Sequence, residues 1–321
     1  MSIRKPLTPQ NHPPPMSSSM SLLFLGTSGS VPTPARNVTS VALKIGKEIL
    51  LFDCGEGTQR QFMLSPFSFM QVSRIFVSHL HGDHFLGVNG LVQTMSFNGR
   101  KEALEIYGPE ETESEMTSFL NLGYFDPSFK ITVRDLKDGE TVDFGEYSVT
   151  AACSDHTVPS LAYAVQEKAR NGKFNRAAAE GLGLKAGPLY RKLQGGATVE
   201  FKGKTITPEM VMGPSRPGRK VVFSGDTKPC ESVTQLAKDC DVLIHEGTVE
   251  SPLEEKTNPY GHSSARQAAM IAKDAGARAL FLVHISPRYE KTDGLLLEAK
   301  GIFSNTTIAE DLMVFDIKYR D

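Results

Sequence analysis

Short apolar runs recur along the chain, and each is followed by glycine or polar residues. The first two are Leu22–Leu25, before Gly26-Thr27-Ser28-Gly29, and Ile49–Phe52, before Asp53-Cys54-Gly55. Five later runs lead into a histidine or an aspartate: Ile75–Ser78 before His79, Val149–Ala152 before Asp155-His156, Val221–Phe223 before Asp226, Val242–Ile244 before His245, and Leu280–Val283 before His284. Runs of this length between turn residues are typical of buried strands. The pattern therefore predicts strands whose ends gather polar side chains at one site.

Helical patterns lie between some of these runs. Ser263–Ala275 spaces Ala, Met and Ile as on one face of a helix and stops at Gly276, and Ser232–Lys238 is a shorter example. Strands with interspersed helices predict an α/β (α+β) sandwich. The length of 321 residues, 40% of them hydrophobic, is enough for one large domain or two small ones.

Several classes of protein are excluded at this stage. No apolar stretch approaches the ~18 to 20 residues that a membrane span needs. Residues 1–20 are rich in Pro and Ser and lack an apolar block, so we expect a disordered tail and not a signal peptide. The four cysteines (Cys54, Cys153, Cys230 and Cys240) have neither CxxC spacing nor the density of a disulfide scaffold. We therefore expect a cytoplasmic protein that makes no membrane contact.

Charge is distributed unevenly along the chain. Residues 168–220 hold twelve Lys or Arg against three Glu, a balance of +9, whereas the rest of the chain carries −11. This segment also breaks the strand pattern, with scattered apolar residues and several glycines, so it predicts an inserted arm with little core of its own. A local basic region is either a contact for a polyanion or a solvated face, and charge alone leaves both open.

The histidines are the strongest chemical signal. Apart from His12, all of them lie at strand ends or in loops, and the densest group is His79-Leu80-His81-Gly82-Asp83-His84. Two imidazoles two residues apart on extended backbone point to the same side, and the tight step at Gly82 lets Asp83 and His84 turn back toward them. Imidazole and carboxylate without thiolate suit a borderline divalent ion, with zinc the first expectation and manganese the second.

The number of candidate ligands exceeds what one ion takes. His156, Asp226 and His284 add to the four within the hexapeptide, so two ions are predicted, with Asp226 as the bridge between them. A lone histidine at a strand end is more often a capping or hydrogen-bonding residue, so the downstream ligands depend on the hexapeptide. Asp53 is expected to be structural, for example as the acceptor that orients a ligand imidazole.

Taken together, these motifs resemble the metallo-β-lactamase superfamily and, more closely, its tRNase Z (ribonuclease Z) family, over residues 21–321. The hexapeptide alone specifies the superfamily, while Gly187-Pro188 inside the basic insertion and the His262 motif narrow it. The other matching motifs are Gly26-Thr27-Ser28-Gly29, Phe52–Thr58, Ser154-Asp155-His156, Ser224–Thr227, His245–Thr248, Gly261–Ser264 and His284–Tyr289. The resemblance implies a four-layer αββα sandwich with residues 168–220 as an inserted, flexible, tRNA-binding arm.

The resemblance also implies ligands and catalytic roles. It assigns His79, His81 and His156 to one ion, Asp83, His84 and His284 to the other, and Asp226 to both, with two Zn²⁺ per subunit and Mn²⁺ as the alternative. Asp83 is expected to orient and deprotonate the attacking water. His262 is the candidate acid for the departing 3′ oxygen, with Glu246 or His245 holding it in place.

The implied activity is that of an endoribonuclease that removes the 3′ trailer from precursor tRNA, leaving a tRNA 3′ hydroxyl and a 5′-phosphorylated trailer. A homodimer is expected, and no nucleotide cofactor. Lys185, Arg191 and Lys192 are the candidate phosphate contacts of the arm. The loop after the first strand departs from the family's Pro-x-Lys-x-Arg-Asn: Pro34 replaces the lysine, which leaves Arg36 as the candidate for the RNA end and leaves the discrimination against CCA open.

Two other classes of function share part of these features. A hydrolase of small phosphodiesters or thioesters would have the hexapeptide but no reason for a basic arm. A non-catalytic RNA-binding protein on a decayed enzyme fold would have lost ligands, and all seven positions are kept. Deletion of the arm separates the first class from tRNA processing, because turnover of small esters should survive it.

Overall fold

The computed structural model describes residues 19–320. The chain divides into two compact units: Lys168–Gly218, and a larger unit made of Ser19–Glu167 together with the residues from Arg219 onward. No helix in the described part of the chain is both long and apolar enough to cross a lipid bilayer. The predicted tail falls outside the described residues except at its end, where Met20 already belongs to the first strand and pairs with Ile45.

The first sheet of the larger unit has seven strands and combines antiparallel and parallel pairing. Its strands, in spatial order, are β16 (Val314–Asp316), β1 (Met20–Gly26), β2 (Ser40–Ile45), β3 (Glu48–Phe52), β4 (Val72–Phe76), β5 (Leu104–Gly108) and β6 (Ile131–Asp135). The pairs from β16 to β3 are antiparallel, and those from β3 to β6 are parallel.

The second sheet also has seven strands. Their spatial order is β15 (Thr306–Ile308), β14 (Leu280–Val283), β13 (Val242–Glu246), β12 (Lys220–Phe223), β9 (Leu161–Glu167), β8 (Tyr147–Cys153) and β7 (Thr141–Asp143). Strands β12 to β15 are parallel to one another, whereas β9 is antiparallel to both β12 and β8. The ends of β12, β13 and β14 therefore lie at one edge of the sheet, together with the polar residues that follow them.

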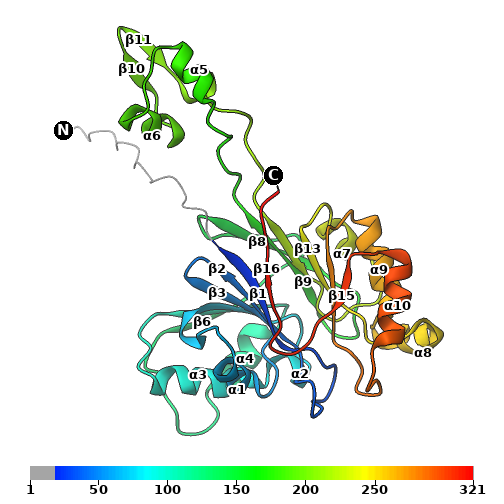
Figure 1. The fold of residues 1–321 in the computed structure, drawn as a ribbon. Coiled ribbons are helices and arrows are strands. Elements are labelled where there is room, and N and C mark those ends of the chain that lie inside the picture. The colour runs from blue at the N-terminus through cyan, green and yellow to red at the C-terminus, as the bar shows by residue number, and fades with distance from the viewer. Residues whose placement is uncertain (1–18, 321) are drawn as a thin grey trace. The chain divides into compact units, whose positions relative to one another are not determined.

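Side chains from both sheets form one central core. Phe24 of β1 stacks on Phe281 of β14 with ring centroids 5.2 Å apart, and Phe52 of β3 lies 5.6 Å from Phe223 of β12. Helices cover the outer faces (Figure 1): α1 (Thr58–Leu64), α3 (Gly87–Phe97) and α4 (Thr112–Leu120) on the first sheet, and α7 (Glu231–Leu236), α9 (Ala265–Asp274) and α10 (Asp293–Ile302) on the second. The predicted αββα sandwich is confirmed.

Helix α9 begins two residues later than the sequence predicted, and its N-terminal cap explains the difference. The predicted segment began at Ser263, but the helix begins after Ser264, whose hydroxyl accepts a hydrogen bond from the backbone N–H of Gln267 while the Gln267 side chain accepts one from the Ser264 N–H. This reciprocal cap satisfies donors that the first turn leaves free. Five short helical segments complete the larger unit: η1 (Phe69–Gln71), α2 (Gly82–Phe85), η3 (Ser251–Leu253), α8 (Glu254–Thr257) and η4 (Asn258–Tyr260).

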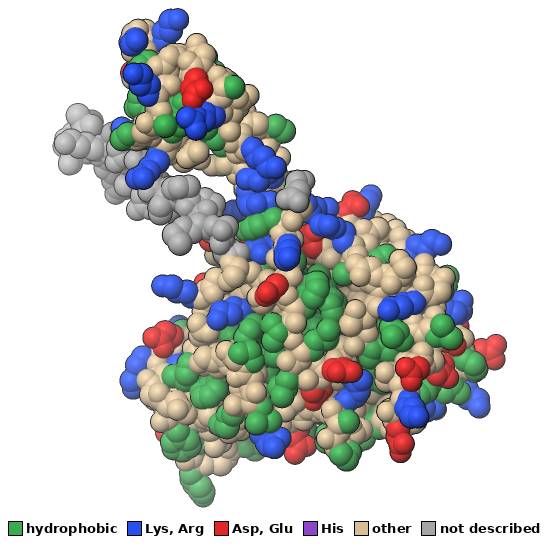
Figure 2. Space-filling view, in the orientation of Figure 1, with side chains coloured by type: hydrophobic (Ala, Val, Ile, Leu, Met, Phe, Trp, Pro, Cys, Tyr) green, Lys and Arg blue, Asp and Glu red, His purple; other side chains and the backbone are tan. Residues whose placement is uncertain are grey.

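The smaller unit contains α5 (Arg176–Gly181), α6 (Pro188–Gln194), β10 (Val199–Phe201), β11 (Lys204–Ile206) and η2 (Pro208–Met210). The expectation that it has little core was wrong. Seven buried apolar residues pack together: Ala179, Leu184, Tyr190, Leu193, Val199, Ile206 and Val211. The scattered apolar positions of the sequence therefore meet once the two helices and the hairpin fold. Lys and Arg side chains lie on the visible surface of this unit (Figure 2).

The predicted arm extended to Lys220, whereas the compact unit ends at Gly218. Lys220 begins β12, and Arg219 is buried in the larger unit. Its guanidinium pairs with Glu167, with Arg219 Nη2 2.6 Å from Oε1 and Nε 2.8 Å from Oε2. The smaller unit thus keeps ten of the twelve basic residues, against three Glu.

Candidate metal centre

Strand ends from both sheets deliver the predicted ligands to one place. His79 lies beyond β4 of the first sheet, and the chain then enters the single-turn helix α2 (Gly82–Phe85), which holds Asp83 and His84. The ligands from the second sheet follow β8, β12 and β14, and they are His156, Asp226 and His284. All seven candidate residues fall into clusters whose ligand atoms lie within 4.8 Å of one another.

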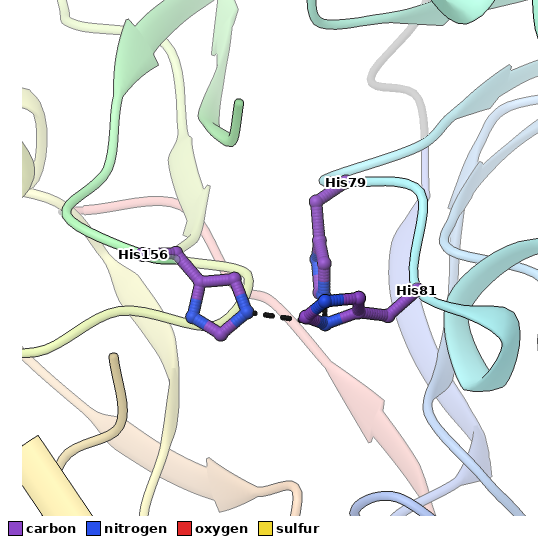
Figure 3. A group of neighbouring side chains, drawn as sticks. All are labelled: His79, His81 and His156. Carbon is purple, nitrogen blue, oxygen red and sulfur yellow. Dashed lines mark hydrogen bonds between the residues drawn. The ribbon is translucent and has the colours of Figure 1, made fainter. Parts of the chain in front are cut away.

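The first cluster consists of three imidazoles (Figure 3). His79 Nε2 lies 2.9 Å from His81 Nδ1, and His156 Nε2 lies 3.2 Å from the same atom. In His156 and His79 the ring nitrogen that faces away from the cluster has a hydrogen-bond partner. His156 Nδ1 lies 2.9 Å from the Gly261 carbonyl oxygen, and His79 Nδ1 lies 3.0 Å from Ser78 Oγ. An N–H donated outward leaves the inward nitrogen with its lone pair, as a metal ligand requires.

The second cluster joins two imidazoles and two carboxylates. His84 Nε2 lies 3.3 Å from an oxygen of both Asp83 and Asp226. His284 Nε2 lies 3.1 Å from Asp226 Oδ2 and 3.5 Å from Asp83 Oδ2. Both Nε2 atoms are buried and have no hydrogen-bond partner among the described residues. Buried orphan nitrogens facing carboxylate oxygens fit a cation that both groups would bind.

Asp226 lies between the two clusters. Its Oδ2 is 3.9 Å from His79 Nε2 in the first cluster and close to both imidazoles of the second. One carboxylate within reach of both groups is the arrangement that a bridging ligand of two ions needs.

The protonation states also suit a metal. Burial lowers the pKa of His79 well below its ordinary value and lowers that of His81, so these imidazoles are neutral and can coordinate. Burial acts to raise the pKa values of Asp83 and Asp226, but the neighbouring imidazoles, His284 and His84, hold both below the usual range. Neutral imidazoles and ionised carboxylates are donors for zinc or manganese. In the second cluster, burial acts to lower the pKa of His84, but Asp226 and Asp53 outweigh it and raise that pKa well above its ordinary value, so this imidazole would release a proton on binding a metal.

Two glycines to which the sequence assigned no role lie directly against the imidazole rings of candidate ligands. A Cβ on Gly29 would lie 2.5 Å from His284 Cε1, and one on Gly261 would lie 2.4 Å from His156 Nδ1. Gly261 also has φ +78°, a conformation that side chains rarely adopt. Thr248 was missed as well: its hydroxyl lies 2.9 Å from His284 Nδ1. Nothing in a single sequence indicates such contacts, because their partners are far away along the chain.

His262 lies beside the second cluster and is partly exposed. Its Nδ1 is 3.2 Å from Glu246 Oε1 and 3.7 Å from Asp226 Oδ2, and its ring stacks on that of His284 at 5.1 Å. Burial acts to lower its pKa, but the Glu246 carboxylate outweighs that and raises the pKa to about 9. Of the two residues predicted to hold it, Glu246 makes the contact. His245 is fully buried, with its Nδ1 2.8 Å from its neighbour's backbone oxygen.

The candidate substrate-binding residues have different surroundings. Arg36 is half-buried, and its Nη1 donates to Thr27 Oγ1 at 2.7 Å and to the Ala309 carbonyl at 2.6 Å. The guanidinium therefore holds its own loop in place, and contact with an RNA end stays a prediction. Lys185, Arg191 and Lys192 are exposed on the smaller unit, the last two on α6.

Known proteins are similar in sequence to this chain over most of its length. It is 48% identical to the Ribonuclease Z of Methanosarcina acetivorans over 300 residues, which are 93% of this chain and 98% of that protein. The chain belongs to the ribonuclease Z family. The Ribonuclease Z of Methanothermobacter thermautotrophicus is 47% identical over 302 residues, 94% of this chain and 98% of that protein.

Structural comparison agrees with the ribonuclease Z assignment. The crystal structure of human tRNase Z, short form, superposes with a TM-score of 0.69 at 27% identity, covering 93% of this chain and all of that one. Two family models match parts of the chain: the β-lactamase superfamily domain over residues 202–285, and the anti-Pycsar protein Apyc1 over residues 20–169. The sequence resemblance to the family is thereby confirmed.

Proposed function

We propose that this chain is a zinc-dependent endoribonuclease that removes the 3′ trailer from precursor tRNA and leaves a tRNA 3′ hydroxyl and a 5′-phosphorylated trailer. The observation that carries the proposal is the complete set of seven candidate ligands beside His262, in a chain that is 48% identical to a ribonuclease Z. A cytoplasmic location is part of the proposal, and the four free cysteines support it.

Two divalent ions would be held as the clusters are arranged. His79, His81 and His156 would hold one, Asp83, His84 and His284 the other, and Asp226 would contact both. When bound, two such ions polarise a phosphate and supply a hydroxide nucleophile near neutral pH. Zn²⁺ is the expected ion for these donors, and Mn²⁺ is the alternative.

Asp83 and His262 divide the proton transfers of the proposed reaction. Asp83 Oδ2 accepts a hydrogen bond from the Ser30 backbone N–H at 2.8 Å, which fixes the carboxylate, and its lowered pKa keeps it ionised as an acceptor for the attacking water. Protonated His262 would give its proton to the 3′ oxygen that leaves from the tRNA. Its raised pKa means that it carries this proton at neutral pH.

The basic unit would supply specificity for a large RNA. A metal centre polarises many phosphodiesters, so selection of a folded substrate has to come from contacts elsewhere. Lys185, Arg191 and Lys192 are exposed, and the unit has a large excess of positive charge for phosphate binding. Its own apolar core would hold these side chains on a folded support.

A homodimer is the proposed assembly. Phe97, the last residue of α3, is exposed, and its ring lies 5.8 Å from that of Phe125 in the segment after α4, which also holds the exposed Leu122 and Tyr124. Apolar side chains gathered on one surface are typical of interfaces. Sedimentation equilibrium should give a dimer for the wild-type chain, and Phe97→Asp with Tyr124→Asp should give a monomer if this surface is the interface.

The test is cleavage of an end-labelled precursor tRNA that carries a 3′ trailer, with and without CCA, in zinc and in manganese. We expect a cut at or just beyond the discriminator position that Asp83→Ala abolishes and the surface control Asp274→Ala keeps. Absence of a cut, in protein shown to hold two metal ions, would overturn the proposal. Small phosphodiester and thioester substrates would then test the alternative hydrolase activity, and RNA binding without turnover would indicate a binding role.

A further inference from the structure

Two cysteines flank the loops that carry His156 and Asp226, and the metal clusters use neither. Cys153 is the last residue of β8, just before the His156 loop, and Cys230 follows the Asp226 loop at the start of α7. Both thiols are free, with Cys153 exposed and Cys230 half-buried. The proposed reaction gives neither thiol a role.

Backbone pairing brings together the two segments that carry these cysteines. Asp155 and Lys228 form an isolated antiparallel bridge, in which the Lys228 N–H donates to the Asp155 carbonyl at 3.0 Å. The side chains of the same two residues form an ion pair at 3.2 Å. Continued by two residues in each direction, this register sets Cys153 opposite Cys230. Opposed residues of an antiparallel pair have Cα atoms about 4.5 to 5.5 Å apart, within the range that disulfides use.

Side-chain contacts agree with this register. Ser232 Oγ donates to the Cys153 carbonyl at 2.5 Å, and Cys230 Sγ lies 3.4 Å from the same Oγ. The Cys230 sulfur is therefore no more than about 6 Å from the Cys153 carbonyl oxygen, so the two residues lie close together. The pKa of the Cys153 thiol is raised by burial, by Asp138 and by Cys230, which agrees with two sulfurs close to each other.

We propose that Cys153 and Cys230 are an oxidation site, a dithiol that hydrogen peroxide converts into an intramolecular disulfide joining the His156 loop to the Asp226 loop. One thiolate attacks a peroxide oxygen, the O–O bond breaks, hydroxide leaves, and a sulfenic acid forms. The second thiol displaces water from this sulfur and forms the S–S bond. Overall the two thiols lose two hydrogens and two electrons, and the peroxide is reduced to two waters.

The other two cysteines are not expected to react. Cys54 and Cys240 are fully buried, and burial raises the pKa of Cys240 to about 12 and that of Cys54 still further. Oxidation requires a thiolate that peroxide can reach, so full burial keeps these two thiols reduced, whereas Cys153 is exposed. The disulfide would close a long loop of the unfolded chain, so we expect the oxidised protein to melt about 5 °C higher than the reduced protein.

The experiment treats the full chain with hydrogen peroxide, blocks the remaining thiols and maps peptides by mass spectrometry. We expect two of the four thiols to be lost and one peptide pair joined through Cys153 and Cys230, together with the higher melting temperature. Cys153→Ser and Cys230→Ser should each abolish the crosslink and the shift, while Cys240→Ser should behave as the wild type. Separate sulfinic acids at the two positions, or a crosslink only between chains, would overturn the proposal.

Discussion

His84 Nδ1 lies 2.7 Å from Asp53 Oδ2, and both side chains are fully buried at the junction of β3 and the metal loop. Asp53 Oδ1 accepts a hydrogen bond from the Ser78 N–H at 2.6 Å, so one carboxylate connects the end of β3 to two positions of the histidine-bearing loop. Because its outer nitrogen faces the Asp53 carboxylate, His84 presents its inner nitrogen toward Asp226. Burial acts to lower the pKa of His84, but the carboxylates of Asp226 and Asp53 outweigh it and raise that pKa well above its ordinary value.

Replacement of Asp53 by Asn should weaken metal binding by roughly 10- to 100-fold. Asn tolerates the backbone conformation here, φ +55°, and keeps an acceptor for Ser78, but it lacks the charge that orients His84. Competition with a chromogenic zinc chelator measures the affinity. Asp241→Asn is the matched control, since Asp241 is also buried but accepts hydrogen bonds from Lys220 and Arg320. Equal affinity for both variants would exclude this role for Asp53.

Gly29→Ala should displace the His284 ring, because the added methyl group would lie 2.5 Å from His284 Cε1. We expect a loss of stability of about 1 to 3 kcal/mol and a marked loss of bound metal. Urea unfolding and metal analysis measure the two effects. Gly301→Ala, in α10 with no atom within 4 Å of the added Cβ, serves as the control and should be neutral or slightly stabilising. Full metal content in Gly29→Ala would show that the ring can move without consequence.

Glu246→Gln should shift the pH dependence of precursor tRNA cleavage. His262 must be protonated to act as the acid, so kcat should fall as pH rises through its pKa, and Glu246 is what raises that pKa. Without the charge the fall should occur at lower pH. The Glu246 carboxylate also accepts hydrogen bonds from the backbone N–H groups of Thr227 and Ser263, so the amide should cost about 1 to 3 kcal/mol of stability.

The pH at which kcat falls on the alkaline side of the profile (the alkaline limb) is therefore the measurement that decides the role of Glu246, and the size of kcat is not. Glu105→Gln, on β5 and paired with Arg74, should leave the limb in place. A profile that is unchanged in Glu246→Gln would contradict control of His262 by this carboxylate.

Replacement of Lys185, Arg191 and Lys192 by Gln should weaken binding of precursor tRNA and flatten its salt dependence. Each lost phosphate contact should reduce the slope of log K against log salt by about 0.7 to 0.9. A filter-binding titration at several salt concentrations measures both effects. Exchange of three exposed lysines of the larger unit (Lys47, Lys101 and Lys130) provides a control with the same charge change. The arm would lose its proposed role if the two triple variants behaved alike.

Arg219→Met should destabilise the protein by about 3 to 5 kcal/mol, because it breaks the buried ion pair between the Arg219 guanidinium and the Glu167 carboxylate. Removal of both charges, in Arg219→Met with Glu167→Met, should restore much of the loss. Chemical unfolding measures the difference. Arg176→Met removes an exposed pair with Glu180 and should have no measurable effect. A double variant as unstable as the single one would show that the aliphatic side chains, and not the broken ion pair, cause the loss.

The sequence by itself determined half of the strands of the two sheets (β1, β3, β4, β8, β12, β13 and β14), the hexapeptide and the candidate ligands that follow it. Alternation and apolar runs are local properties, so strands such as β4 and β14 could be predicted together with the histidines that follow them. The hexapeptide places four candidate ligands next to one another in the chain, and this chemistry needs no knowledge of the fold. The insertion was visible for the same reason, as a local change of charge and pattern.

Only the tertiary structure decided which groups hold these ligands and where the units end. Asp53 and His84 are separated by 31 positions, and Thr248 and His284 by 36. The contact of Gly29 with His284 and the backbone bridge between Asp155 and Lys228 also join distant segments. Such contacts form only when two sheets pack and their strand ends meet. Arg219 likewise belongs to the larger unit, where it is buried together with Glu167. In the sequence it looks like one more residue of the basic segment, because its partner is known only once the chain has folded.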